Sequence, residues 1–353
     1  MRIVAEDFIG ETRAAVVDGD RVVELHIERW SERGARVQRG EVYRARVRSI
    51  DKSLNGAFCD LGRGPDGFLP FGKQGRIDGV HEGAAIGVQI NRESFQDKGP
   101  SLVLFDVEPG DAPEAVIEAP PVAERLSMMF DAPVRTPREA DLDLDALFDE
   151  ALDPIVPLPG GGRLIIEPVT AMCVIDVDAA GRKAQSGGAK FALDLNRVAA
   201  REAGRQIRLR GLGGVVAIDF LPLRKKADQN ILAQTLSGAF KNDPAKIDIA
   251  PASRFAIVEL ARQRLGRALH EQMWSEYRVL STESLALDAL RACERAVRAR
   301  RASQLTMRAS KAVKSWLDED KIGWRSAWLK SYGFELTVTA QDAGQFNRPF
   351  ELE

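Results

Sequence analysis

Two stretches of the sequence, MCVIDVD at residues 172–178 and GVVAIDF at residues 214–220, decide the fold. Each is an apolar run rich in Val and Ile that leads to an aspartate, a pattern typical of buried strands in α/β proteins. Between them, roughly Lys190–Leu209 has the apolar spacing of a helix. A strand–helix–strand unit returns the chain beside its first strand, so we expect the two strands to be neighbours in one sheet.

The aspartates of these strands, Asp176 and Asp219, should then point at one spot at the edge of the sheet. Carboxylates held that close repel each other unless a cation neutralises them. Oxygen ligands suit Mg²⁺, or alternatively Mn²⁺, and such an ion lowers the pKa of a bound water and stabilises charge that develops on phosphorus. The pattern therefore predicts a metal site. The alternative is that each aspartate only caps a helix or loop after its strand.

Charge is divided unevenly along the chain. The formal net charge is only −2, but residues 181–270 contain 17 basic and 7 acidic residues, whereas residues 106–153 contain 14 acidic and 3 basic ones. A basic segment of this size favours binding to a polyanion, although charge runs also occur on solvated faces. Ser186–Gly188 could approach a phosphate or form only a flexible loop. Four arginines of the expected helix share one stripe and are candidates for binding such a polyanion: Arg197, Arg201, Arg205 and Arg208.

The N-terminal part of the chain is rich in predicted β-structure. Apolar runs within Arg13–Arg29 flank the turn Asp18–Asp20 and predict a hairpin. From Gly40 to about Leu104, short strands alternate with turns that contain Gly and Pro, which favours a small, strongly bent barrel of the OB type. Its Phe58 and Phe68 could stack on bases, although phenylalanines in strands are usually core residues.

These patterns predict a mixed α/β fold with an inserted OB barrel. We expect residues 1–39 to form a hairpin that packs on the core, 40–108 the barrel, 109–159 an acidic linker, 160–280 the α/β core and 281–353 a small C-terminal α/β domain. Residues 109–159 hold 9 of the 17 prolines, so we expect one short helix there at most, Asp141–Leu152. Further helices are expected after Pro222 and near Ser253.

The cellular context follows from the cysteines and from the hydropathy of the chain. Cys59, Cys173 and Cys293 lie far apart and form no CxxC pair, which favours a reducing compartment and argues against a cysteine zinc site. The N-terminus carries acids where a signal peptide needs a basic start, and no apolar run approaches the ~18 residues of a membrane span. We therefore expect a soluble cytoplasmic protein that does not bind a membrane.

Several long strings carry a resemblance to one known family. GEVYRARVRSIDKSLNGAFCDLGRGPDGFLP (residues 40–70) resembles the OB-fold RNA-binding domain inserted near the start of RNase E/G proteins. LPGGGRLIIEPVTAMCVIDVDA, then RQIRLRGLGGVVAIDF and SRFAIVELARQRL, resemble their catalytic core. The resemblance is strong over Gly40–Leu104 and Gly160–Leu265, fainter over Met1–Arg39 and the C-terminal domain, and lost between.

This resemblance implies roles for individual residues. In the family, the aspartates of the two strands bind the catalytic magnesium, which implies that role for Asp176 and Asp219. Asp178 stands where the family commonly has asparagine; it could orient water or metal, and it adds a negative charge. The resemblance also implies contacts with RNA by four further residues, Phe58, Phe68, Lys98 and Arg254.

The sequence departs from the family pattern in two places. After ARQRL the family usually continues into a CPxC segment whose thiolates share zinc between subunits, whereas this chain reads GRALHEQMWSEY. We therefore expect no zinc, and any oligomer should form without a zinc link. The family also has a longer insertion before LPGGG, with a pocket for a 5′-monophosphate; here the acidic linker stands in its place, and Arg135-Thr136 only faintly echoes the Arg-Thr pair of that pocket.

The sequence thus predicts a magnesium-dependent endoribonuclease that hydrolyses single-stranded RNA in RNA processing or decay, with Asp176, Asp219 and Asp178 as catalytic residues. An alternative hypothesis is a non-catalytic RNA-binding protein of the same fold. A third hypothesis, a metal-binding structural subunit without RNA, is disfavoured by the basic stripe.

Overall fold

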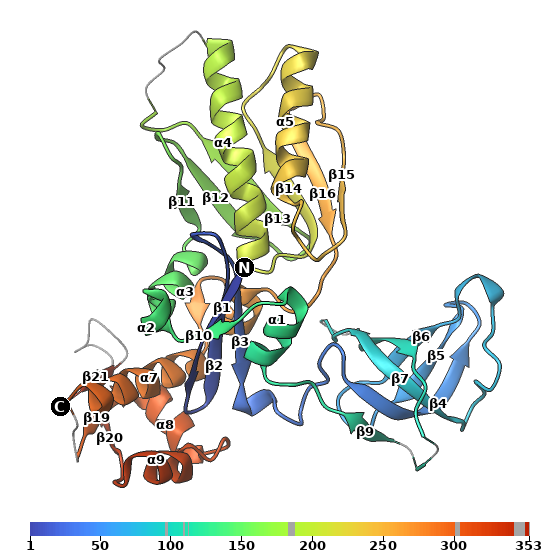
Figure 1. Ribbon diagram of the computed structural model, residues 1–353, viewed down its shortest axis with the longest axis vertical. Coiled ribbons are helices and arrows are strands. Elements are labelled where there is room, and N and C mark those ends of the chain that lie inside the picture. Colours follow the sequence, from blue (N-terminus) through green and yellow to red (C-terminus); the bar gives the residue numbers. More distant parts are fainter. Residues whose placement is uncertain are drawn as a thin grey trace.

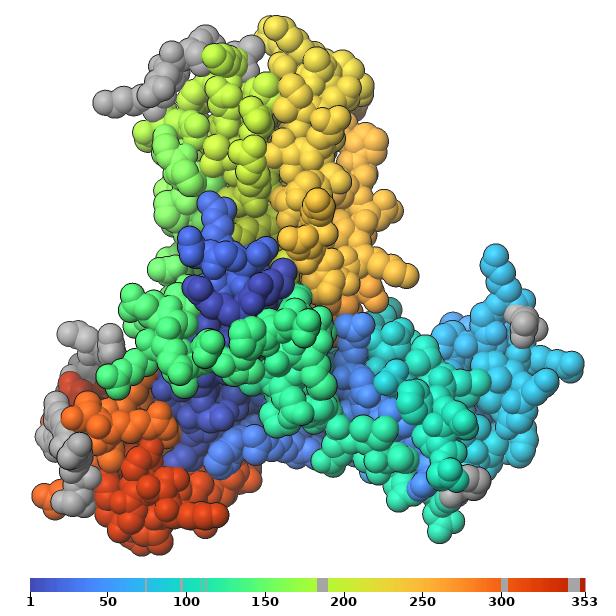
Figure 2. All heavy atoms as spheres, in the orientation of Figure 1, coloured from blue at the N-terminus to red at the C-terminus, as the bar shows by residue number. Residues whose placement is uncertain are grey.

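Three lobes surround a small N-terminal sheet in the computed structural model of the protein (Figure 1). The structure describes residues 1–95, 98–108, 110–111, 113–182, 188–300, 304–341 and 350–352. The lobes are an α/β lobe, a β-barrel and a C-terminal lobe, and the space-filling view shows N-terminal residues (blue) where they meet (Figure 2). The predicted mixed α/β fold with an inserted barrel and a small C-terminal domain is confirmed.

The central sheet is built from the first residues of the chain. Strands β1 (Arg2–Phe8), β2 (Glu11–Asp18) and β3 (Arg21–Arg29) pair antiparallel, and β10 (Val134–Arg135) adds to β1 in parallel. Asp18 pairs with Arg21 across the turn, and Gly19 takes the left-handed conformation (φ 60°) that tight hairpin turns need. The predicted hairpin therefore has the expected turn.

The acidic segment 109–159 contains more secondary structure than its prolines led us to expect. It provides β9 (Glu114–Ile117), which pairs with the barrel, and helices α1 (Val122–Phe130), α2 (Pro137–Ala140) and α3 (Leu144–Leu152). Short amphipathic stretches between the prolines bury apolar side chains against the central sheet, and this packing stabilises helices too short to form alone. Of these helices only α3 lies within the predicted range.

The barrel closes through five strands, namely β4 (Val42–Asp51), β5 (Gly56–Asp60), β6 (Gly67–Pro70), β7 (Ala85–Arg92) and β8 (Ser101–Leu104). β4 is long enough to pair with β7 along its first half and with β5 along its second half, which closes the barrel. Alternation along β4 buries Tyr43, Ala45 and Val47 in the barrel core. The short 3₁₀ helices η1 (Trp30–Glu32) and η2 (Gly72–Gln74) lie in loops before and within the barrel.

The α/β lobe has a six-stranded sheet in the order β11-β12-β13-β14-β16-β15, in which β13 and β14 are parallel and the other neighbours antiparallel. Helices α4 (Gly188–Leu209) and α5 (Lys226–Ala239) cover one face of this sheet (Figure 1). The strands are β11 (Ile155–Pro157), β12 (Arg163–Pro168), β13 (Cys173–Asp178), β14 (Gly214–Asp219), β15 (Ile247–Ile249) and β16 (Ile257–Arg262).

The helix expected near Ser253 is wrong, because the chain there leads into strand β16. Val258, Leu260 and Arg262 are buried, whereas Glu259 and Ala261 between them are exposed. This period of two is the strand pattern, and pairing with β14 and β15 overrides the helix propensity of Glu, Leu, Ala and Arg in IVELAR.

The C-terminal lobe follows a short connecting unit, α6 (Leu269–Met273) with the hairpin β17 (Trp274–Glu276) and β18 (Val279–Leu280). Its core contains Trp324 and Trp328. Strand β19 (Thr306–Ser310) lies between β20 (Thr337–Gln341), which is parallel to it, and β21 (Phe350–Leu352), which is antiparallel. Its helices are α7 (Thr282–Arg300), α8 (Lys311–Glu319) and α9 (Trp324–Tyr332). Among the described residues, no helix combines the length and the apolar character needed to cross a membrane.

Candidate metal centre

Asp176 and Asp219 lie side by side on adjacent strands. The register of the parallel pair β13 and β14 matches these two residues directly. Side chains alternate along a strand, and Ile175 and Ile218 are buried in the core under α4 and α5. Both aspartates are therefore on the opposite face, where they are exposed to solvent. We call this face, which carries Met172, Val174 and Asp176 beside Val215, Ala217 and Asp219, the open face of the sheet.

The electrostatics of this pair suit a divalent cation. Partial burial, the neighbouring Asp219 and then Asp178 raise the pKa of Asp176 above its usual range. A cation between the two carboxylates would remove this repulsion. Within the described ranges, no group of three or more His, Cys, Asp or Glu side chains is placed to hold a metal. Two carboxylates nevertheless fit Mg²⁺, which is commonly bound by one or two of them and keeps its other positions for water and phosphate oxygens.

Asp178 is already engaged by the protein. Its Oδ2 accepts hydrogen bonds from Arg163 Nε (2.8 Å) and Nη2 (2.7 Å), and its Oδ1 accepts one from the backbone N–H of Ala180 (2.8 Å). These bonds lower the pKa of Asp178. The guanidinium thus offsets the charge that Asp178 adds beside Asp176. Arg163 was not among the predicted site residues, because its role depends on the antiparallel register that sets it opposite Asp178.

Arg254 lies in a loop at the same end of the sheet as the aspartates. The turn is closed by the Ser253 N–H, which donates to the carbonyl of Ile257 (2.8 Å), and Ile257 is the register partner of Asp219 on β16. The guanidinium of Arg254 stacks on the ring of Phe255, 4.7 Å from its centroid, and 67% of Phe255 is exposed. The structure therefore brings an arginine and an exposed aromatic ring to the carboxylate end of β14.

The predicted arginine stripe is separated from the aspartates. Helix α4 packs on the covered face of the sheet, so its side chains lie across the sheet from Asp176. Arg208 is buried in an ion pair with Glu24 of β3 (2.7 Å), and Arg205 binds Glu202 and the carbonyl of Val22. These contacts hold α4 on the central sheet; Arg201 of the stripe is exposed and Arg197 half-buried. Ser186 and Gly187, which precede the helix, lie outside the described residues.

Phe58 and Phe68 form an aromatic pair on the barrel. They face each other across β5 and β6 with ring centroids 5.3 Å apart. Both are half-buried and lie outside the core cluster, whereas their neighbours Ala57, Cys59 and Leu69 belong to it. Lys98 is exposed in the loop that precedes β8. This arrangement leaves aromatic surface and a cation accessible on the barrel, as base stacking requires.

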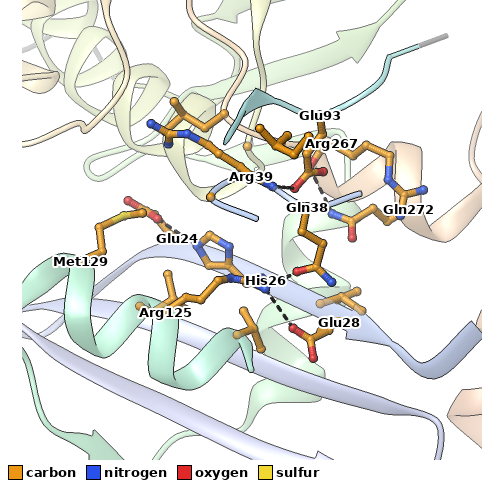
Figure 3. Close-up of a pocket in the computed structure, with 18 of the residues that line it drawn as sticks. Glu24, His26, Glu28, Gln38, Arg39, Glu93, Arg125, Met129, Arg267 and Gln272 are labelled. Atoms are coloured by element: carbon orange, nitrogen blue, oxygen red, sulfur yellow. Dashed lines mark hydrogen bonds and ion pairs between the residues drawn. The ribbon is translucent and has the colours of Figure 1, made fainter. Parts of the chain in front are cut away.

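A cavity of about 450 Å³ lies where the barrel, the central sheet and the α/β lobe meet (Figure 3). Much of its polar lining is paired: Arg125 binds Glu28 and Gln38, and Arg267 binds Glu32. Glu93 accepts a hydrogen bond from the backbone N–H of Arg39 (3.3 Å), and burial raises its pKa despite this bond and the nearby arginines. These contacts fix the chain segment that leads into the barrel, at Gln38 and Arg39, against α1 and the residue after β7.

Comparison with known proteins identifies one family. The model of the "Ribonuclease E/G family" matches residues 117–265, so the similarity includes part of the acidic segment in which we expected it to be lost. Ribonuclease E of Synechocystis is 38% identical over 128 residues, which are 36% of this chain and 19% of that protein.

Two further relatives match over more of the chain. Ribonuclease E of Haemophilus influenzae is 23% identical over 469 residues, covering 94% of this chain and 50% of that protein, and that of Escherichia coli is 24% identical over 421, covering 80% and 39%. Both alignments are longer than the 353 residues of this chain, so they include residues of the relatives that have no counterpart here. The chain spans half or less of the length of these relatives.

Proposed function

The chain belongs to the ribonuclease E/G family, and we propose that it is an endoribonuclease that hydrolyses single-stranded RNA with a divalent ion, Mg²⁺ or Mn²⁺, held by Asp176 and Asp219. The observation that carries this proposal is the direct register of the two carboxylates on the open face. Such a reaction would place the protein in RNA processing or decay.

The residues around the pair have distinct tasks in this proposal. When bound, the ion would supply a water of lowered pKa and stabilise charge at the phosphorus. Asp176 and Asp219 bind the ion, and their strands fix their separation. Asp178, held by Arg163, stays beside them as one half of an ion pair. Arg254 is positioned to contact the RNA backbone at the carboxylate end of β14.

The path of the RNA follows the accessible aromatic and basic groups. Phe58 and Phe68 provide a stacking surface on the barrel, with Lys98 as a cation for the backbone. Arg205 and Arg208 are not included, because they bind protein groups on the covered side of the sheet. Exposed Arg201 could reach RNA only beyond the edge of that sheet.

Cleavage of single-stranded RNA with and without Mg²⁺ tests the proposal. Asp219→Asn should abolish turnover, because it removes one of the two charged ligands, and should leave RNA affinity unchanged or slightly higher, because a negative charge disappears. Asp248→Asn is the matched control, since Asp248 is exposed on β15 of the same sheet and lies apart from the pair. Wild-type cleavage by Asp219→Asn would refute the metal site. RNA binding by the wild type without any cleavage would instead favour the non-catalytic alternative.

A further inference from the structure

A second, larger hollow of about 770 Å³ lies between the barrel and the α/β lobe. The segments that line it include the turn Pro168–Met172, the start of β14 at Gly213–Val215, the barrel loop with Ser94 and Phe95, and the hairpin Trp274–Tyr277. We call it the hairpin groove. The hairpin belongs to the stretch GRALHEQMWSEY, to which sequence analysis assigned no function.

The walls of the hairpin groove are aromatic. Trp274 and Tyr277 meet edge to face with centroids 5.6 Å apart, and 49% of Tyr277 is exposed at the tip of the hairpin. On the barrel side, the guanidinium of Arg264 lies 3.7 Å from the centroid of the Phe95 ring. Exposed aromatic rings and planar guanidinium groups are the surfaces on which unpaired bases stack in protein–RNA complexes.

The groove is continuous with the open face of the sheet. Val215 on β14 and Met172, which directly precedes β13, line it, and each stands four residues before the aspartate of its segment, Asp219 or Asp176. At about 3.3 Å per residue, the groove begins about 13 Å from the aspartate pair along the same face. A single strand with a phosphodiester at the aspartates can therefore reach the groove with a nearby base.

Two of the three arginines that line the groove are paired with acids. Arg264 Nη1 forms an ion pair with Glu271 (2.9 Å), and Arg267 forms one with Glu32, so these two cations are largely neutralised. The tyrosine hydroxyl of Tyr277 donates to Glu167 (3.3 Å). Several polar groups of the lining are thus occupied, while the ring of Tyr277 and the apolar side chains of Met172 and Val215 stay exposed. A planar, neutral ring fits this aromatic and apolar lining, and Arg36, which also lines the groove, can contact a phosphate beside the base.

We infer that the hairpin groove is a nucleobase-binding subsite, in which a base of single-stranded RNA stacks on Tyr277 beside the Phe95–Arg264 pair. The inference rests on the proposed function, which supplies RNA as the ligand. A base anchored at a fixed distance from the aspartates sets which phosphodiester reaches them, so the subsite would help to determine where the RNA is cut. Base binding in this subsite depends on the ring of Tyr277 and not on its hydroxyl.

The test compares Tyr277→Ala with Tyr277→Phe. Both variants lose the hydrogen bond to Glu167, but only the alanine variant loses the ring, so the pair isolates stacking from any structural effect of that bond. Both are made in the Asp219→Asn background to keep the RNA intact. Affinity for a short fluorescein-labelled oligoadenylate is measured by fluorescence anisotropy at one salt concentration, since the electrostatic part of binding varies steeply with salt. Leu329→Ala, an exposed position on α9, serves as a distant control.

Loss of one base–ring stack should raise the dissociation constant of Tyr277→Ala about fivefold or more, with Tyr277→Phe and Leu329→Ala unchanged. Equal affinities of the alanine and phenylalanine variants overturn the subsite while the proposed function stands. Loss of self-association in the alanine variant alone, with RNA affinity unchanged, would overturn it in favour of a contact between two copies of the chain. If neither the wild type nor Asp219→Asn binds the oligonucleotide, the proposed function and the subsite fail together.

Discussion

Replacing Glu11 by glutamine should strongly destabilise the protein. Glu11 is fully buried on β2 and its carboxylate lies 2.7 Å from Arg13 Nε, 2.5 Å from Arg291 Nη1 of α7 and 3.5 Å from Arg29 Nε of β3. It therefore links the central sheet to the C-terminal lobe. Glutamine keeps the shape but removes the buried counter-charge that the three guanidinium groups share, and leaves them only the partly exposed Asp145, Glu283 and Asp288. Breaking a buried ion pair in this way costs about 3–5 kcal/mol.

The destabilisation caused by Glu11→Gln should depend on pH. Burial alone would raise the pKa of Glu11, but Arg13, Arg291 and Arg29 together lower it below its usual value of 4.5. An acid with a lowered folded-state pKa stabilises the protein fully above its unfolded pKa, and this stabilisation is lost as the pH falls through the folded-state pKa. The difference between wild type and Glu11→Gln should therefore be full at neutral pH and shrink below about pH 4.5.

Thermal unfolding followed by calorimetry measures both effects. A loss of 1 kcal/mol lowers Tm by about 2–4 °C in a cooperative unit of roughly 150–250 residues. Glu11→Gln should therefore lower Tm by roughly 6–20 °C at neutral pH. Asp318→Asn is the matched control, because its ion pairs with Lys314 and Arg325 are exposed and such pairs contribute about 1 kcal/mol or less. A Glu11→Gln Tm within about 2 °C of wild type would refute the reasoning that this network holds the lobes together.

Three further predictions concern Glu93 in the 450 Å³ cavity, the zinc content of the protein and the 5′ end of the RNA. Burial raises the pKa of Glu93, so its charged form costs stability as the pH rises. Glu93→Gln should therefore raise Tm at neutral pH and lose this advantage in acid. A lower Tm of the variant at neutral pH would contradict this prediction. Elemental analysis should find no stoichiometric zinc, and chelators should not change the oligomeric state. A structural zinc site needs four converging ligands, whereas Cys59, Cys173 and Cys293 are buried in different lobes. Cleavage should not depend on a 5′-monophosphate on the RNA. Thr136 caps α2 by accepting a hydrogen bond from the Glu139 N–H (3.3 Å), and the surrounding segment is acidic. A preference of about tenfold or more for the monophosphate, removed by Arg135→Ala, would show a sensor there.

Local patterns in the sequence were sufficient for much of the fold. The turn at Asp18–Asp20, the alternation along β4 and the apolar runs of β13 and β14 each report a structure that neighbouring residues determine. The aspartate pair was predictable for the same reason, because a strand–helix–strand unit leaves few alternatives for the placement of its two strands.

Features set by distant partners were not predictable from one sequence. The arginine stripe of α4 has the correct helical spacing, but Arg208 is bound by Glu24, 184 residues earlier, and no local signal reports that ion pair. Strand β16 needed its partner β14 to override a helix-like composition. In the acidic segment, α1 depends on burial against the central sheet. The hairpin groove is assembled from several segments far apart in the sequence, so Trp274 and Tyr277 carried no recognisable pattern.

Binding of Mn²⁺ in the absence of RNA tests most directly whether Asp176 and Asp219 hold a metal ion together. Electron paramagnetic resonance measures free Mn²⁺, so a titration reports metal binding independently of catalysis. The wild type and Asp248→Asn should bind the ion alike, whereas Asp176→Asn and Asp219→Asn should each lose most of the affinity, because a two-carboxylate site retains a single charged ligand after either change. Undiminished binding by either variant, in protein with an unchanged Tm, would contradict the assignment of the metal centre.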